Sequence, residues 1–185
     1  MQINKLSIAG LLHLVPARFG DERGFFSETF NAGKFHEATG ADSVFVQDNH
    51  SLSRDVGVLR GLHCQLPPFA QSKLLRVTRG RIFDVAVDIR RSSPTYGHWE
   101  GLELSAKDWN QLYIPKGFLH GFCTLEPDTE VIYKVDTLYA PGHEAGVIWK
   151  DPDLAIKWPL LGKKPTLSAK DQVLPRFADF QSPFE

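Results

Sequence analysis

The 185-residue chain carries 21 basic and 22 acidic side chains, a formal charge of −1. It therefore lacks the excess of Lys and Arg that marks nucleic-acid-binding and membrane-surface proteins. Its length predicts one domain, residues 1–185, with a hydrophobic core of its own. Cys64 and Cys123 make neither a disulfide framework nor a CxxC pair, and we expect both as small buried hydrophobic residues.

The first ten residues, MQINKLSIAG, lack the basic segment and long apolar run of a signal peptide. No stretch of the chain approaches the roughly 20 apolar residues of a membrane span. We therefore expect a cytoplasmic protein with neither membrane nor nucleic acid as partner.

Short runs of β-branched and aromatic residues, separated by Gly, Pro, Asn and Asp, dominate the chain. One helix is predicted at 31–39, with Asn31 as its cap, and a short turn at 167–174 begins at Ser168. Gly80 predicts a hairpin turn between two apolar runs. The last dozen residues, rich in Phe and Pro, are expected to pack against the barrel. The predicted strands are 43–49, 73–79, 81–89, 98–104, 111–115, 120–125 and 130–135.

This density of strands is typical of an all-β sandwich or barrel and not of βαβ units. We predict a jelly roll with short peripheral helices, whose concave mouth is the natural place for a ligand.

Polar residues within the apolar strands are the candidates for chemistry. If 58–65 is extended, alternation places His63 and Gln65 on one face of the strand. Arg60 then points to the other face, unless Gly61 interrupts the pleat.

Three further polar residues lie on other predicted strands or beside them. Lys73 begins one strand, His120 follows a Pro-x-Gly turn, and Tyr133 lies on a late strand. Each has a structural alternative: a histidine that stabilises the fold, a solvated lysine at a strand end, or a tyrosine on a half-buried strand.

Metal-binding jelly rolls of the cupin type usually supply His-x-His and a following Glu from one hairpin and another His from a later segment. Here the later His120 is present, but the first motif reads His63, Cys64, Gln65, and LPPFAQSK contains no carboxylate. Two imidazoles and an amide are a poor ligand set for first-row metals. We therefore expect no metal.

Over nearly its whole length the chain resembles the dTDP-4-dehydrorhamnose 3,5-epimerase family. The stretches that carry the resemblance occur in the family's order: DERGFFSETF (21–30), QDNHSLS (47–53), GVLRGLHCQLPPFAQSKLLRV (57–77), VDIRRSSPTYGHW (87–99), QLYIPKGFLHGF (111–122), EVIYKV (130–135), EAGVIWKDPDLAIKWP (144–159) and LSAKD (167–171).

The resemblance implies a cupin-type double-stranded β-helix that works without metal or cofactor, as a homodimer with exchanged N-terminal strands. Its substrate would be dTDP-4-keto-6-deoxy-D-glucose, whose carbons 3 and 5 both lie α to a ketone. Deprotonation to an enolate and return of a proton from the other face invert each carbon. The matching motifs imply His63 as base, Asp171 as the carboxylate that orients it, Tyr133 as acid and Lys73 as the charge beside the enolate oxygen.

The same match implies the residues that bind substrate. Arg23, Arg60 and Lys170 would contact the diphosphate, and His120 the sugar or phosphates. Arg23 and Glu28 would act in the partner's pocket through the strand exchange. The remaining implied contacts to nucleotide or sugar are Gln47, Asn49 and Glu144.

Two positions depart from the family pattern. Cys64 replaces an aromatic residue, and Leu138 stands where a second tyrosine often precedes Tyr139. Three alternatives stay open: a single-site epimerase or ketoisomerase of another deoxysugar, a non-catalytic sugar-binding cupin, and a metal-dependent cupin oxygenase.

Overall fold

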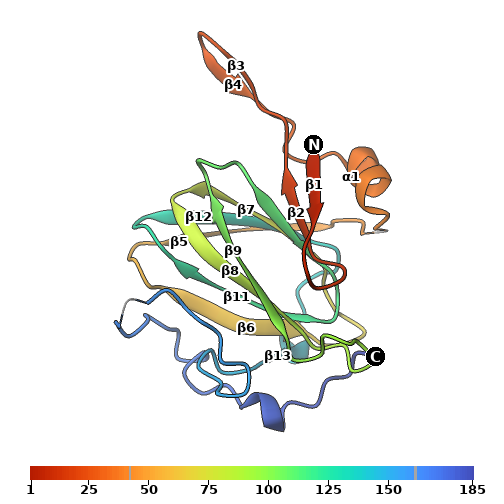
Figure 1. Cartoon of the computed structure of the whole chain (residues 1–185), viewed down its shortest axis with the longest axis vertical. Coiled ribbons are helices and arrows are strands. Elements are labelled where there is room, and N and C mark those ends of the chain that lie inside the picture. Colours follow the sequence, from red (N-terminus) through yellow and green to blue (C-terminus); the bar gives the residue numbers. More distant parts are fainter. Residues whose placement is uncertain (42, 161) are drawn as a thin grey trace.

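The computed structural model describes residues 1–41, 43–160 and 162–185. Two antiparallel sheets face each other, and a two-stranded hairpin projects from them (Figure 1). In order across the first sheet lie β1 (Gln2–Lys5), β2 (Leu12–Val15), β10 (Gln111–Ile114), β7 (Lys73–Arg79), β12 (Thr129–Val135) and β5 (Gln47–Ser53). Across the second lie β13 (Glu144–Gly146), β6 (Leu59–Gln65), β11 (Phe118–Thr124), β8 (Arg81–Asp88) and β9 (Trp99–Ser105). The predicted all-β, cupin-type jelly roll is confirmed.

The remaining elements are short and lie outside the two sheets. They are the hairpin of β3 (Phe19–Asp21) and β4 (Gly24–Phe26), the helix α1 (Ala32–Thr39), and the 3-10 turns η1 (Pro141–His143) and η2 (Phe177–Asp179). The prediction for α1 is confirmed, including its cap, because the Asn31 side chain accepts a hydrogen bond from Lys34 N. Across the described residues we find no helix with the length and apolarity that a membrane span requires.

Six of the seven predicted strands match observed ones to within two residues at each end. The strand predicted at 43–49 is misplaced, because β5 spans Gln47–Ser53 and residues 43–46 lie outside any strand. The alternating Val44 and Val46 suggested a strand, yet both are exposed. β5 is polar because one of its faces borders the cavity described below and the other faces outward.

The predicted hairpin at Gly80 is also wrong. β7 and β8 lie on either side of Gly80, but β7 pairs with β10 and β12 while β8 pairs with β9 and β11. The chain therefore crosses from one sheet to the other at Gly80. The positive φ of 78° at this residue is a conformation that glycine adopts without the penalty of a side chain.

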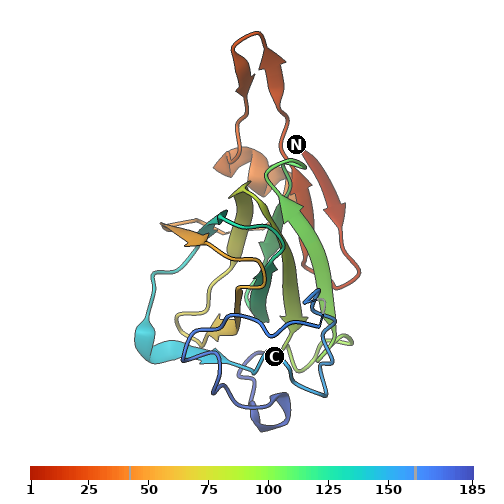
Figure 2. The same ribbon diagram turned by 90° about the vertical axis from the view of Figure 1, so that its left-hand side faces the viewer.

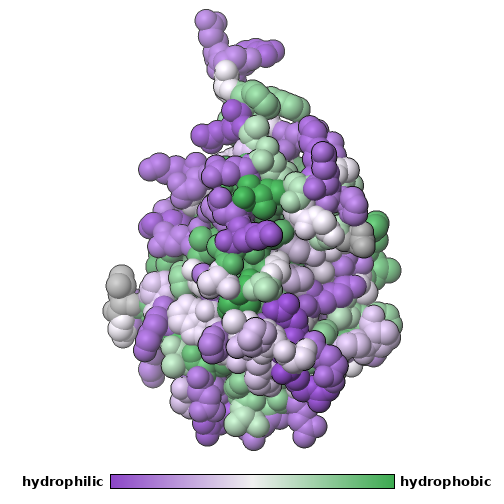
Figure 3. Space-filling view, turned by 45° about the vertical axis from the view of Figure 1, so that its right-hand side comes forward, coloured by the Kyte–Doolittle hydropathy of each residue, from purple (hydrophilic) through white to green (hydrophobic). Residues whose placement is uncertain are grey.

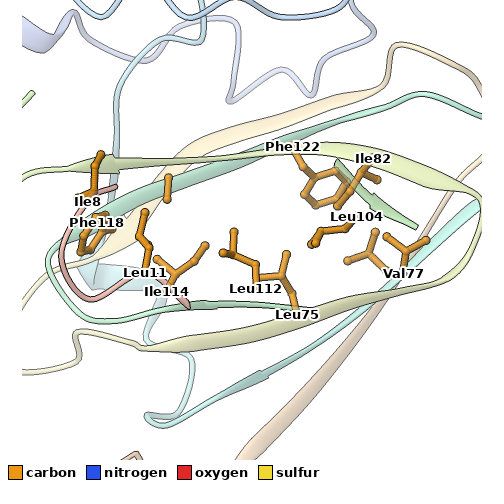
Figure 4. Close-up of a cluster of buried hydrophobic side chains, with 12 residues drawn as sticks. Ile8, Leu11, Leu75, Val77, Ile82, Leu104, Leu112, Ile114, Phe118 and Phe122 are labelled. Carbon is orange, nitrogen blue, oxygen red and sulfur yellow. The ribbon is translucent and has the colours of Figure 1, made fainter. Parts of the chain in front are cut away.

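The hydrophobic core fills one part of the space between the two sheets. Figure 4 shows its side chains pointing toward one another from both sheets. Fully buried members such as Leu75, Ile82, Leu104 and Leu112 are apolar residues of β7, β8, β9 and β10. Their burial supplies the main driving force that holds the sheets together.

A second cluster covers the outer face of the five-stranded sheet. It includes Leu62, Cys64, Val85 and Val87, and the C-terminal segment packs onto it. Phe177, Phe180 and Phe184 are among the covering residues, which confirms the predicted packing of the tail; the other covering residues include Val147, Leu154, Ile156 and Trp158. The segment after β13 thus crosses the sheet and brings residues near 170 back to β6 (Figure 2).

The β3–β4 hairpin extends away from both sheets (Figures 1 and 2). Phe19, Phe25 and Phe26 on it are exposed by 64, 56 and 70%. Figure 3 shows hydrophobic residues on this projection below a hydrophilic tip. An apolar projection of this kind is typical of a segment that packs on another surface.

Candidate active site

A cavity of about 260 Å³ lies between the two sheets, beside the hydrophobic core. Strands of both sheets contribute to it: β6 and β11 from one, and β5, β7 and β12 from the other. The lining residues are Ser51, Arg60, His63, Lys73, His120, Phe122, Tyr133, Ser168 and Asp171. Sequence analysis named six of these nine as candidate site residues: Arg60, His63, Lys73, His120, Tyr133 and Asp171.

His63 and Asp171 form a hydrogen-bonded pair in this cavity. His63 Nε2 lies 2.5 Å from Asp171 Oδ1, and the Asp171 side chain is only 3% exposed. A turn holds the carboxylate in place, since Asp171 N donates to Ser168 Oγ at 3.1 Å. With Nε2–H donated to the carboxylate, Nδ1 is the nitrogen that carries the free lone pair.

The charge state of His63 suits a base. Burial lowers the pKa of His63, although the nearby Asp171 carboxylate opposes this; Lys73 and Lys170 lower it further. The imidazole is therefore neutral at a lower pH than a free histidine would be, and can accept a proton.

Lys73 lies in the cavity and is not the solvated strand-end residue that sequence allowed. Its Nζ lies 3.4 Å from Nδ1 of His120, and burial lowers the pKa of this amine. His120 Nε2 in turn lies 3.0 and 3.1 Å from the two oxygens of Asp84, whose side chain is fully buried. Lys73, His120 and Asp84 thus form a chain of polar contacts into the barrel.

Tyr133 enters the cavity from β12, in the sheet opposite His63. Burial raises the pKa of its phenol, and the positive charge of Arg60 opposes that rise. The phenol stays protonated at neutral pH and can donate a proton.

Arg60 lines the same cavity as His63, although simple alternation places them on opposite faces of β6. The pairing of β6 with β11 shifts register between His120 and Phe122, opposite Gly61, whose φ is 120°. An added Cβ at Gly61 would lie 2.6 Å from Gly121 Cα, so only glycine fits here. The interruption of the pleat brings the guanidinium to the cavity.

A second, smaller chamber of about 120 Å³ adjoins the first and shares His63, Lys73 and Tyr133 with it. Lys170 Nζ donates to Glu144 Oε2 at 2.5 Å beside this chamber, and Gln47 Nε2 donates to Asn49 Oδ1 at 2.9 Å. The lining also includes Cys64, Gln65, Gln71 and Tyr139, together with Gln47, Asn49 and Glu144.

Gln65 stands where a metal-binding strand would carry its second histidine, and the structure shows what its amide does. Nε2 donates to the carbonyls of Phe69 at 2.7 Å and Leu138 at 3.3 Å, while Oε1 accepts from Ala140 N at 2.7 Å. Both the nitrogen and the oxygen of this amide therefore hold backbone groups. Among the described residues, no three His, Cys, Asp or Glu side chains converge as a metal site would require.

Two neighbouring glutamines hold the same backbone. Gln71 Nε2 donates to Thr137 O at 2.7 Å, and Gln47 Oε1 accepts from Tyr139 N at 3.0 Å. We call residues 137–140 the strap. Three glutamine side chains fix it, and it carries Tyr139 to the smaller chamber.

Arg23 and Glu28 are not brought to the cavity of their own chain. Arg23 lies in the β3–β4 turn, with its side chain 89% exposed and paired with Asp21 at 2.5 Å. Glu28 pairs with Lys34 at 2.8 Å at the start of α1.

Comparisons with known proteins identify the family of the chain. A sequence model of the family described as dTDP-4-dehydrorhamnose 3,5-epimerase matches residues 5–179. An epimerase of that name from Shigella flexneri is 51% identical over 179 residues, which is 97% of each chain. The chain belongs to this family.

Solved structures of 3,5-epimerases share the fold. A dTDP-6-deoxy-D-glucose-3,5-epimerase from Legionella pneumophila, in complex with dTDP-4-keto-L-rhamnose, is 44% identical, with a TM-score of 0.93 over 97% of this chain and 94% of that one. The dTDP-4-dehydrorhamnose 3,5-epimerase from Bacillus anthracis, with TDP and PPi bound, is 48% identical, with a TM-score of 0.91 over 95% of this chain and 99% of that one. The resemblance read from the sequence is confirmed, and the chain is an isomerase.

Sequence reasoning missed Asp84, Ser51, Phe122 and Ser168 as neighbours of this site. Asp84 had a readable signal, since it is a carboxylate within the otherwise apolar run RIFDVAVDI at 81–89. A charged residue on a buried strand needs a partner. The other three carry no local signal.

Proposed function

We propose that this chain inverts carbons 3 and 5 of dTDP-4-keto-6-deoxy-D-glucose and so produces dTDP-4-keto-L-rhamnose, a precursor of dTDP-L-rhamnose. The observation that carries the proposal is the placement of a His–Asp pair and a tyrosine on opposite sheets of one cavity. A base on one wall and an acid on the other can remove a proton from one face of a sugar ring and return one to the opposite face.

Each residue of the cavity has its own role in the proposed reaction. Nδ1 of His63 takes the proton from carbon 3 or 5, and Asp171 orients the ring and stabilises the imidazolium. The electrons of the broken C–H bond pass to the ketone, and Lys73 offers a positive charge to the enolate oxygen. Tyr133 gives its proton to the carbanionic carbon from the other side, while Arg60 favours the phenolate that is left.

The nucleotide diphosphate accounts for the cations at the edge of the site. Arg60 and Lys170 would bind the phosphates, for which a guanidinium offers a fork of donors. We assign Gln47, Asn49 and Glu144 to the sugar and nucleoside. His120 lines the cavity beside the sugar, with its two ring nitrogens facing Asp84 and Lys73. The two chambers, joined at His63, Lys73 and Tyr133, give room for both parts of such a ligand.

The remaining two residues imply a partner subunit. Arg23 and Glu28 lie on or next to a projecting hairpin with three exposed phenylalanines. We propose a homodimer that exchanges this segment, so that each copy supplies Arg23 and Glu28 to the other's site. We place the enzyme in the cytoplasm, with nucleotide-sugar synthesis.

Turnover in deuterated water tests the activity. An enzyme that deprotonates both carbons places solvent deuterium at carbon 3 and carbon 5 of the product, and proton NMR resolves the two positions. We expect deuterium at both. Deuterium at carbon 3 alone would replace the proposal by a single-site epimerase, and its absence from both carbons would indicate a sugar-binding protein.

A further inference from the structure

Asp84 has no part in the reaction as described above, yet it is fully buried beside the cavity. An ionised carboxylate loses its hydration when it is buried and needs hydrogen bonds or a countercharge in return. Within the described residues its side chain bonds to one group, the imidazole of His120, which lies almost equally far from both oxygens at 3.0 and 3.1 Å.

This contact decides which nitrogen of His120 carries the proton. A carboxylate can only accept, so Nε2 is protonated and donates to Asp84. In the neutral ring Nδ1 then bears a lone pair, and it is Nδ1 that lies 3.4 Å from Lys73 Nζ. Lys73 donates to it, which fixes the direction of one of its three N–H bonds.

The opposite charges of Lys73 and Asp84 also stabilise each other. Burial disfavours the ammonium form of Lys73, and the nearby Asp84 charge favours it. Asp84 lies in the interior of the barrel on β8, whereas Lys73 enters from β7 in the opposite sheet. His120 on β11 connects the two.

We propose that Asp84 is a positioning residue, which fixes the Nε2–H tautomer of His120 and thereby aims the Lys73 ammonium at the enolate oxygen. This rests on the proposed function for the role of Lys73. The site thus contains two His–Asp pairs, His63 with Asp171 and His120 with Asp84, whose histidines lie on the neighbouring strands β6 and β11. One works by accepting a proton and the other by holding a charge in place.

The experiment uses Asp84→Asn, which removes the charge and offers both donor and acceptor to His120. Imidazole ¹⁵N NMR, assigned by loss of the signal in His120→Gln, reports the tautomer directly. We expect the Nε2–H form in the wild type and a mixture containing the Nδ1–H form in Asp84→Asn. We expect kcat to fall on the order of 10²-fold, as when a preorganised donor to a developing oxyanion is lost, with KM within about twofold.

Two comparisons separate positioning from general support of the fold. If Asp84 acts through Lys73, Asp84→Asn causes no further loss of residual turnover in a Lys73→Met background. Asp88→Asn is the matched control: Asp88 is equally buried on the same strand but accepts from Arg90, Ser93 and Thr95. We expect it to lower the melting temperature with the His120 tautomer and kcat unchanged.

An Nδ1–H tautomer of His120 in the wild type overturns the proposal, whether or not Asp84→Asn folds. So does a full additional loss in the Lys73→Met background, or a kcat within twofold of wild type. Absence of wild-type turnover would contradict the proposed function instead, since the tautomer is measured without substrate.

Discussion

Nε2 of His63 lies 2.5 Å from Oδ1 of Asp171, although 108 residues separate them in the chain. The C-terminal segment makes the contact possible, because it packs across the outer face of the five-stranded sheet and returns to the end of β6. The segment between β13 and Asp171 therefore does more than cover hydrophobic surface: it brings the carboxylate to the imidazole of the proposed base.

The pair makes a prediction about pH. The proposed base must be neutral, so kcat/KM rises with pH through the pKa of His63, which burial holds below its ordinary value. The Asp171 charge opposes that shift. Asp171→Asn should therefore lower the pKa further, move the acidic limb of the profile to lower pH, and reduce the plateau on the order of 10²–10⁴-fold because the ring loses its orientation.

Lys170→Met should shift the acidic limb of the pH profile in the opposite direction. Lys170 lowers the pKa of His63, so its removal should move the acidic limb to higher pH. Profiles of kcat/KM for the three proteins, measured at one ionic strength, check both directions. Limbs that move the same way in both variants would show that this ionisation does not belong to His63.

Gln65 gives a prediction about the strap. Gln65→Leu leaves Ala140 N–H and the carbonyls of Phe69 and Leu138 without their partner, at a cost of about 1–3 kcal/mol for each group that stays buried. We expect a melting temperature lower by several degrees, and a raised KM because Tyr139 is no longer held at the cavity.

Gln65→Glu refines this test, since it keeps the acceptor for Ala140 N–H and loses both donors. At neutral pH its stability should lie below that of the wild type, because a buried carboxylate then faces the carbonyl oxygens of Phe69 and Leu138. Gln172→Leu, at an exposed position, is the control and should change neither quantity. An unchanged KM in Gln65→Leu would mean that the strap does not position the site.

The sequence predicted the architecture more completely than it predicted the site. Strand positions were predicted from apolar runs with period two, so the polar strand β5 was misplaced. The crossing from one sheet to the other at Gly80 was mistaken for a hairpin. Local patterns indicate that a strand exists but not which strand it pairs with.

Within the site, local sequence patterns do not reveal contacts between residues that are far apart in the chain. His63 and Tyr133 could be suspected as polar residues on apolar strands, whereas Asp171 reads locally as an exposed turn and was found through the family resemblance alone. The Arg60 side chain reaches the cavity because the register shifts near Gly61, a backbone detail that residue alternation does not encode.

Mixed dimers test the exchanged segment. In the proposed dimer each site combines His63 of one chain with Arg23 of the other. His63→Ala and Arg23→Ala, each weak or inactive alone, should therefore produce one intact site when co-expressed with different tags and purified as the mixed dimer. We expect about half the wild-type turnover per mixed dimer. Activity no higher than that of Arg23→Ala alone would place Arg23 in its own chain's site or outside any site.

The final prediction concerns Tyr133 as acid. If His63 removes both protons, they leave from the face that His63 occupies, and the protons that invert the centres come from the opposite sheet. Tyr133→Phe keeps the ring, which packs against the hydrophobic core, and removes only the hydroxyl. His63 can still take a proton and return a deuteron to the same face, so deuterium enters recovered substrate without inversion.

We expect Tyr133→Phe in deuterated water to exchange hydrogen at carbons 3 and 5 while epimerisation falls at least about 10²-fold, most clearly at carbon 5. Proton NMR separates the two, because exchange removes a signal and inversion changes its coupling constants. His63→Ala is the control and should neither exchange nor invert. Efficient inversion by Tyr133→Phe would transfer the role of acid to another group or to water, and loss of exchange along with inversion would show that the phenol is needed before the first proton leaves.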